Sequence, residues 1–260
     1  MKELKEIEKS IQKKYRKEIF SKFVKAVKDF NLIEPGDVIA ICISGGKDSF
    51  LLAKCMQELK RHNKFQYELR FIVMDPGYKE EKLEQIKENA RILNIPIEIF
   101  DTNIFDVVKD TTSPCFLCAR MRRGCLYAKA QELGCNKIAL GHHFNDVIET
   151  ILLNMIYNGK FSGMLPILDS DHFEGMKLIR PLYYVKEKDI LSWVKYTELE
   201  FLDCACKITK KKIGSRREIK ALSYELKEMY ENADINILNA MFNVNPNTTF
   251  QDKAINKKNK

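Results

Sequence analysis

Short apolar runs and amphipathic segments alternate along the central part of this 260-residue chain. Runs rich in β-branched residues and bounded by turn residues are typical of buried strands. They predict strands at 38–43, 68–74, 96–100, 137–140 and 177–182. Apolar residues at helical spacing predict helices at 50–61, 79–93, 119–133, 145–157, 187–196 and 215–231. This alternation predicts an α/β fold, a doubly wound parallel sheet of about five strands with helices on both faces.

Residues 1–30 have a different pattern, in which apolar side chains recur every four positions. The stripe consists of Ile7, Ile11, Tyr15, Ile19, Phe23 and Val27. Lysines occupy much of the remaining surface, so the pattern predicts one long amphipathic helix. Because the stripe lies opposite a face of mixed charge, we expect this helix to pack on the core rather than on a membrane.

These patterns divide the chain into three parts. Residues 1–36 form the basic amphipathic helix and a turn, 37–200 form the central α/β domain, and 201–260 form a helical C-terminal addition. That addition starts with a cysteine-containing loop, continues as a basic helix and ends in a polar tail. The chain contains no internal repeat and no Ser/Gly-rich linker, so we expect one central domain with terminal additions.

The most informative motif follows the first predicted strand. It reads Ser44, Gly45, Gly46, Lys47, Asp48 and Ser49. Glycines let a backbone approach an anion, and the N–H groups at a helix N-terminus point at it, so this strand–loop–helix predicts a phosphate-binding site. Its spacing differs from that of a Walker A motif. The loop resembles the SGGxDS loop of the PP-loop ATP pyrophosphatases, which implies that the protein uses ATP.

Two further polar segments fall on the same edge of the predicted sheet. Residues 75–77 follow the second strand, and Gly141 with two histidines follows the fourth. Ligands of doubly wound sheets bind beyond the carboxyl ends of the strands, so we expect the active site at this edge. Asp146, one turn into the next helix, is a candidate to hold Mg²⁺ or to take a proton. Adjacent histidines seldom bind one ion, so we expect one of them to pack and the other to border the site.

Composition and charge fit a cytoplasmic enzyme. Hydrophobic residues make up 45% of the chain and charged residues 31%, and no apolar run reaches membrane-spanning length. The N-terminus has no apolar segment typical of a secretion signal. The net charge of +8 is concentrated in residues 1–30 and 207–220. Such basic clusters are either solvated helix faces or a surface for RNA, because phosphate contacts dominate affinity for nucleic acids.

The eight cysteines divide into two groups. Cys42, Cys55, Cys125 and Cys135 fall on apolar faces or near helix ends, and we expect buried small side chains. Cys115 and Cys118 form a CxxC at a predicted helix start, and Cys204 and Cys206 form a second pair far away in sequence. We predict a metal site built from Cys115, Cys118 and one or both of the later pair. Three ligands would leave an open coordination position, as in catalytic sites.

Taken together, the motifs resemble those of the tRNA 2-thiocytidine synthetases, PP-loop sulfurtransferases that thiolate a cytidine in the tRNA anticodon loop. The resemblance extends from about Ile11 to about Asn245. Besides the phosphate loop it rests on the CxxC with its Arg-rich continuation at 120–124, the segment 138–143, residues 154–160, and Ile179-Arg180-Pro181-Leu182.

The resemblance implies cofactors and residue roles. ATP would be bound by Ser44–Ser49 and Gly141, while Asp48 and Asp146 would place Mg²⁺ and take part in catalysis. A [4Fe–4S] cluster would be held by Cys115, Cys118 and a third cysteine, for which spacing slightly favours Cys206 over Cys204. This chain departs from the family at Asn145, where relatives commonly carry an acid.

The implied reaction is adenylation of the cytidine C2 oxygen followed by its replacement with sulfur. The implied partners are the tRNA anticodon loop and a sulfur donor, either a cysteine desulfurase or sulfide; a homodimer is possible. Arg122, Arg123, Arg180 and the basic run 207–220 are candidates for tRNA phosphate contacts.

Three alternatives remain open at this stage. The chain could be another PP-loop tRNA-modifying or small-molecule sulfurtransferase, or a lysidine-synthetase-like ligase, which would not need the cysteine pairs. A non-catalytic RNA-binding protein with a structural Cys₄ zinc is the third. It would leave the phosphate loop unexplained.

Overall fold

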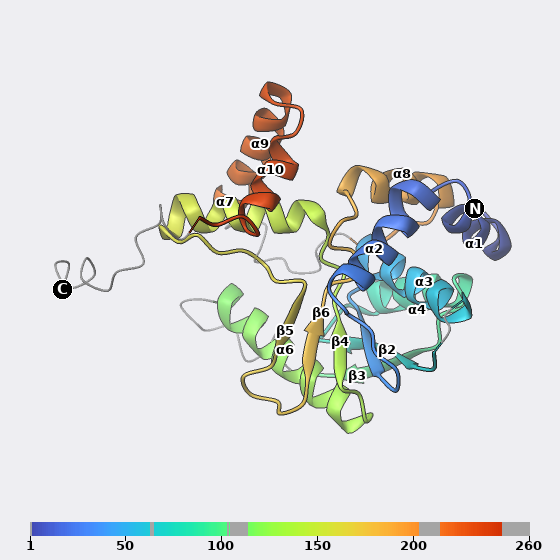
Figure 1. The fold of residues 1–260 in the computed structure, drawn as a ribbon. Helices are drawn as coiled ribbons and strands as arrows, with labels where there is room; N and C mark the ends of the chain where they lie inside the picture. Colours follow the sequence, from blue (N-terminus) through green and yellow to red (C-terminus); the bar gives the residue numbers. More distant parts are fainter. Residues whose placement is uncertain (1, 63–64, 103, 105–113, 203–213, 246–260) are drawn as a thin grey trace. The chain divides into compact units, whose positions relative to one another are not determined.

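The computed structural model describes residues 2–62, 65–102, 104, 114–202 and 214–245, with the backbone alone for 114–120 and 214 (Figure 1). Within these residues the chain divides into two compact units. The first comprises Met1–Asp146 with Leu165–Ile213, and the second comprises Val147–Met164 with Gly214–Lys260. The boundaries expected from the sequence, at 36/37 and 200/201, stay a prediction.

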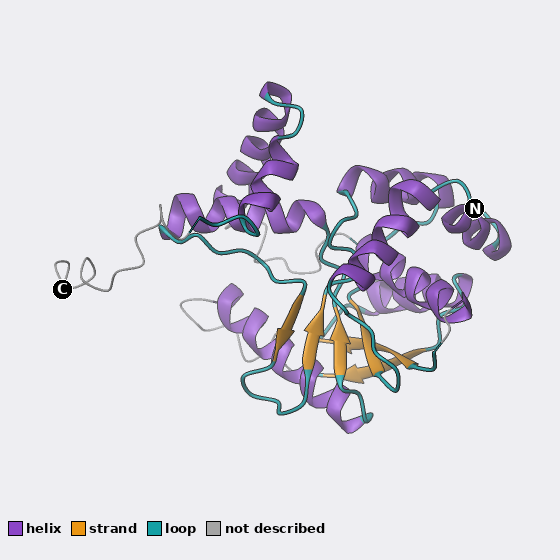
Figure 2. Ribbon diagram, in the orientation of Figure 1, coloured by secondary structure: helices purple, strands orange, loops and turns teal. Residues whose placement is uncertain are grey.

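A mostly parallel sheet forms the centre of the first unit (Figure 2). Its strands are β1 (Val38–Ile43), β2 (Glu68–Asp75), β3 (Ile97–Asp101), β4 (Lys137–Ala139), β5 (Ile167–Asp169) and β6 (Lys177–Ile179). Their order is β3-β2-β1-β4-β6-β5, and only the β5–β6 pair is antiparallel. The α/β prediction is confirmed, and so are the five predicted strands. The sixth strand, β5, was missed because two of its three residues are exposed, so it has no apolar run.

Helices pack on both faces of this sheet. Alternate residues of β1 point to opposite sides, so Ile39 and Ile41 pack in one core cluster and Ala40 and Cys42 in another. The larger cluster includes side chains from α3 (Lys47–His62), α4 (Glu80–Ile92) and α8 (Glu187–Thr197). The smaller one includes side chains from α6 (Pro114–Glu132). The doubly wound arrangement is therefore present in the described residues.

The N-terminal segment is not one uniform helix. It consists of α1 (Leu4–Gln12), a π-helical stretch η1 (Arg16–Phe20) and α2 (Ser21–Asp29). The physical reason is the four-residue period of its apolar stripe, because an α-helix has 3.6 residues per turn and the stripe would drift around it. A π-helical turn is wider, so it raises the average number of residues per turn. Its hydrogen bonds join residues five apart, as do those from Tyr15 N to Ser10 O and from Phe20 N to Tyr15 O. All six stripe residues are buried.

The second unit contains the rest of α7 (Phe144–Asn158), whose first residues belong to the first unit, together with α9 (Gly214–Met229) and α10 (Ala233–Ala240). Lys227 of α9 pairs with Asp234 of α10 at 2.6 Å, and Tyr157 of α7 donates a hydrogen bond to Glu218 of α9. Helix α10 was not predicted from the sequence. No helix in the described ranges is long and apolar enough to cross a membrane.

Candidate active site

The phosphate loop is shorter than its sequence predicts. Strand β1 ends at Ile43 and α3 begins at Lys47, so Lys47, Asp48 and Ser49 form the first helical turn. The Ser49 hydroxyl donates to Gly46 O at 2.8 Å and accepts from Ser44 N at 3.2 Å. Ser49 therefore closes the loop on itself, and the Ser44 hydroxyl, 3.4 Å from the Ser49 oxygen, lies beside it. The backbone N–H groups at this helix N-terminus favour an anion.

Two glycines allow other segments to approach this loop. Gly45 has a φ of +85°, and a Cβ there would lie 2.8 Å from Leu202 Cδ1. Leu202 N also donates to Gly45 O at 3.0 Å. At Gly141, after β4, a Cβ would lie 3.0 Å from both Asp48 C and Ser49 N. Glycine is favoured at 45 by the positive φ and at 141 by the close backbone contact, so the sequence signal at these positions reflects local geometry as well as ligand approach.

A network of charged groups borders the loop. Lys47 Nζ lies 3.1 Å from Asp48 Oδ2 and 3.8 Å from Glu187 Oε1 of α8. Glu187 was missed by the sequence analysis, because only the tertiary structure brings the first turn of α8 beside the loop. Asn145 explains part of this placement, since its Oδ1 accepts a hydrogen bond from Glu187 N at 2.9 Å.

His143 stands between the two predicted carboxylates. Its backbone N–H donates to Asp146 Oδ2 at 2.9 Å, its Nδ1 lies 3.5 Å from the same oxygen, and its Nε2 lies 3.9 Å from Asp48 Oδ1. His143 is buried, whereas His142 lines a cavity, as the sequence led us to expect of such a pair. Asp48 Oδ1 is buried and accepts no hydrogen bond from the described residues.

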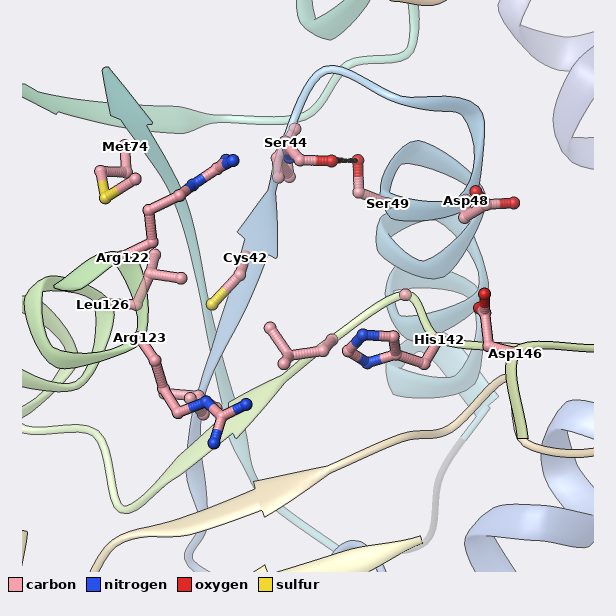
Figure 3. A pocket seen from close by; sticks show the side chains of 14 residues that line it. Cys42, Ser44, Asp48, Ser49, Met74, Arg122, Arg123, Leu126, His142 and Asp146 are labelled. Atoms are coloured by element: carbon pink, nitrogen blue, oxygen red, sulfur yellow. Dashed lines mark hydrogen bonds between the residues drawn. The ribbon is translucent and has the colours of Figure 1, made fainter. Parts of the chain in front are cut away.

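The first cavity, of about 450 Å³, opens at the carboxyl ends of β1 and β4 (Figure 3). It is lined by Ser44, Asp48 and Ser49 from the loop, and by Gly141 and Asp146 from the other side. Figure 3 shows Arg122 and Arg123 extending from α6 along the wall formed by β1. The predicted segment 75–77 does not line it; there Asp75 Oδ1 accepts hydrogen bonds from Gly77 N and Tyr78 N.

A second cavity, of about 500 Å³, shares Ser44, Asp48 and Arg122 with the first. Its other walls come from Lys47, Tyr78, Phe201 and Leu202, and from Leu191 and Val194 of α8. The two cavities therefore flank the phosphate loop.

The predicted metal ligands lie at the border of the described structure. Cys115 and Cys118 fall in the first turns of α6, where the backbone alone is described, and Cys204 and Cys206 lie outside the described residues. Among the described side chains, no group of three or more His, Cys, Asp or Glu residues could hold a metal ion. The predicted metal site is therefore not tested by the described part of the chain.

The other four cysteines were predicted to be buried. Cys42, Cys55 and Cys135 are buried, and Cys125 is half-buried. Burial raises the pKa of Cys42 to about 12 and that of Cys135 to about 11, so both thiols are protonated at neutral pH. These thiols pack as small apolar groups.

Arg180 is buried, so it is poorly placed for the surface phosphate contact considered above. Burial and the charge of Arg123 lower the pKa of Arg180 to about 10, which leaves the group charged at neutral pH. One guanidinium nitrogen donates to Leu165 O. Arg122 and Arg123 remain candidates because they line the cavities.

The glycine–serine loop between β1 and α3 of this doubly wound sheet fits a PP-loop protein. The PP-loop domain family matches residues 12–210 of this chain. Comparison with individual relatives narrows the family further. A tRNA-cytidine(32) 2-sulfurtransferase of Syntrophotalea carbinolica is 37% identical over 85% of this chain and 87% of its own. A protein of the same name from Geobacter metallireducens is 36% identical over 90% and 92%. The chain belongs to the tRNA-cytidine(32) 2-sulfurtransferase family.

One solved structure with the same fold is the U34-tRNA thiolase of Methanococcus maripaludis, described with its [4Fe–4S] cluster. It superposes with a TM-score of 0.68 over 85% of this chain and 76% of the thiolase, at 22% identity. At that identity the similarity supports the fold.

Proposed function

We propose that this protein is an ATP-dependent tRNA sulfurtransferase that adenylates the C2 oxygen of an anticodon-loop cytidine and replaces it with sulfur. The observation that carries the proposal is the second cavity. Its lining joins the phosphate loop to Arg122, four residues after Cys118, and to Leu202, two residues before Cys204. Family membership points in the same direction.

The described residues suit the nucleotide half of the reaction. The N–H groups of the loop and of the first turn of α3 would bind phosphate oxygens, and Lys47 would neutralise part of their charge. Lys47 is held between Asp48 and Glu187, so it is oriented at the mouth of the loop. Attack of the cytidine C2 oxygen on the α-phosphorus forms one P–O bond and breaks the bond to pyrophosphate.

The carboxylates fit a divalent cation. Asp48 Oδ1 is buried and has no hydrogen-bond donor among the described residues, and Asp146 lines the same cavity. Mg²⁺ prefers carboxylate oxygen and phosphate ligands, so these two residues would hold it against the triphosphate. When bound, the ion would neutralise charge that develops on the leaving pyrophosphate.

The thiols fit an iron–sulfur cluster by their chemistry, and a described residue near each pair, Arg122 and Leu202, lines the second cavity. Soft thiolates are the ligands that such clusters use, and Cys115, Cys118 and Cys206 or Cys204 would supply three of them. The cluster, when bound, would supply an iron with an open position able to hold sulfide. In the second half of the reaction a sulfur nucleophile adds at C2, the C2–O bond breaks, and AMP leaves.

tRNA is the proposed substrate, and its target base would have to be unstacked to enter a cavity of this size. A sulfur donor, either a cysteine desulfurase or sulfide, and a homodimer are proposed partners.

Nucleoside mass spectrometry of tRNA from a strain that lacks this gene tests the proposal. We expect loss of 2-thiocytidine, and its recovery when the gene is restored but not when an Asp48→Asn variant is supplied. Unchanged 2-thiocytidine would overturn the cytidine assignment. Loss of a different thionucleoside, or of lysidine, would move the protein to one of the alternative activities.

A further inference from the structure

The π-helical stretch has a consequence for the outer face of the N-terminal segment. Because the buried stripe recurs every four residues, the positions two residues away from it form a second line on the opposite side. That line carries Lys5, Lys9, Lys13 and Lys17, which we call the lysine ladder. All four side chains are exposed, and they follow one another over about 18 Å of helix.

The ladder is not neutralised by its surroundings. The side chains of the four lysines make no ion pair or hydrogen bond with the described residues. Two acidic residues of the same segment pair with other cations: Glu8 pairs with Lys54 at 2.8 Å and with Arg61 at 2.9 Å, and Glu6 contacts Lys2 at 4.0 Å. A row of like charges repels itself, and a bound polyanion relieves this repulsion.

The position of the ladder relates it to the candidate active site. The N-terminal segment packs on α8, with Tyr15 donating to Ser192 O at 2.9 Å and Lys22 pairing with Asp189 at 3.3 Å (Figure 1). Leu191 and Val194 of the same helix line the second cavity. Helix α8 therefore contacts both the segment that carries the ladder and the second cavity.

We propose that the lysine ladder binds the phosphate backbone of the tRNA whose target base enters the cavity. This inference rests on the proposed function. An extended polyanion matches a row of four cations better than a compact ligand does, and phosphate contacts position RNA without reading its sequence. A lipid surface is the less suitable occupant, because the apolar stripe of this segment is buried and has nothing to insert.

The test compares the full-length protein with a Lys9→Gln/Lys13→Gln/Lys17→Gln variant. Binding of unmodified tRNA is measured between low and moderate salt, with binding of a non-hydrolysable ATP analogue as a second readout. We expect at least tenfold weaker tRNA binding at about 0.1 M salt, and a log–log salt slope smaller by roughly 2 to 3 for the three lost contacts. Binding of the ATP analogue should be unchanged.

Two further variants separate charge from other effects. Lys60→Gln/Lys87→Gln/Lys177→Gln removes the same charge from α3, α4 and β6, and should keep the wild-type salt slope. Lys9→Arg/Lys13→Arg/Lys17→Arg should restore both slope and affinity.

Each outcome decides between the proposals. A ladder variant that binds tRNA with wild-type affinity and slope overturns the ladder and leaves the proposed function intact. Equal losses in the ladder and control variants also overturn it, since they show an effect of net charge alone. A wild-type protein that binds no tRNA overturns the proposed function itself. Ladder-dependent binding to vesicles with about 30% anionic lipid, without ladder-dependent tRNA binding, assigns the surface to a membrane instead.

Discussion

At the scale of single residues, the phosphate loop depends on how closely other segments approach it. Gly141 packs on the backbone of Asp48 and Ser49, and Gly45 packs on Leu202. Backbone atoms in the first turn of α3 are held by helix hydrogen bonds and cannot yield as a flexible side chain can. The loop's shape is therefore set by contacts as much as by its own sequence.

We expect Gly141→Ala to weaken binding of ATP at least tenfold and to lower the free energy of unfolding by about 1–3 kcal/mol, the usual range for overpacking. The added Cβ would lie 3.0 Å from Asp48 C and Ser49 N. Calorimetry with an ATP analogue and urea denaturation measure the two effects. Gly124→Ala is the matched control, because a Cβ there meets nothing within 4 Å and it lies within helix α6. If both variants show the same ATP affinity and the same free energy of unfolding, the close contact at Gly141 contributes to neither.

Cys42 lines the first cavity, yet its burial raises its thiol pKa to about 12. A raised pKa means that the reactive thiolate is absent at neutral pH and increases as pH approaches 12. At pH 8 the thiolate fraction is on the order of one in ten thousand. We expect Cys42 to resist iodoacetamide at pH 7–9 in the folded protein and to react readily in urea, as followed by peptide mass spectrometry. Equal rates in the two states would contradict this burial.

At the scale of elements, the N-terminal segment illustrates how a pattern sets a helix type. Its apolar period of four residues predicts a helix, and the π turn is the way in which the backbone keeps that period on one face. The same geometry aligns the lysine ladder. The backbone geometry that keeps the apolar stripe on the buried face therefore also sets the positions of the lysines on the exposed face.

Phe23 of α2 is fully buried in the larger core cluster. Phe23→Ala should lower the free energy of unfolding by about 3–5 kcal/mol, because the cavity left behind adds to the lost burial. Lys28→Ala, at an exposed position of the same helix, should change it by no more than about 0.5 kcal/mol. Denaturant unfolding of both variants gives the comparison. A small effect at Phe23 would mean that the segment is not docked on the core.

At the scale of the whole molecule, residues far apart in sequence meet at the phosphate loop. Helix α6 brings Arg122, and the chain before Cys204 brings Leu202, to the wall of one cavity. Glu200 O accepts hydrogen bonds from Gln85 at 3.1 Å and Asn89 at 2.8 Å, which fix that chain against α4. The two cysteine pairs are therefore attached to segments that the fold anchors beside the loop.

The proposed cluster predicts a pattern of iron loss across single serine variants purified without oxygen. Cys115→Ser and Cys118→Ser should each lose most of the iron and sulfide, because each removes a ligand. Of Cys204→Ser and Cys206→Ser, one should behave in the same way, and we expect it to be Cys206→Ser. Cys55→Ser serves as the control, since Cys55 is buried in the core and belongs to neither cysteine pair. Zinc without sulfide in the wild type would replace the cluster by a structural zinc site.

The sequence by itself determined the local features of this protein. The strand 38–43, a strand starting at 177, the loop at Ser44–Ser49 and the CxxC at the start of α6 are visible in the chain, because residue spacing and glycine chemistry act over a few residues. From the resemblance of these motifs to a known family, a reaction could then be predicted.

Only the tertiary structure decided which distant groups share a site. It brought Glu187 to Lys47, placed Asn145 under the first turn of α8, buried Arg180 and added β5 to the sheet edge. None of these contacts has a local pattern, because each depends on how helices and strands pack against one another once the core has formed.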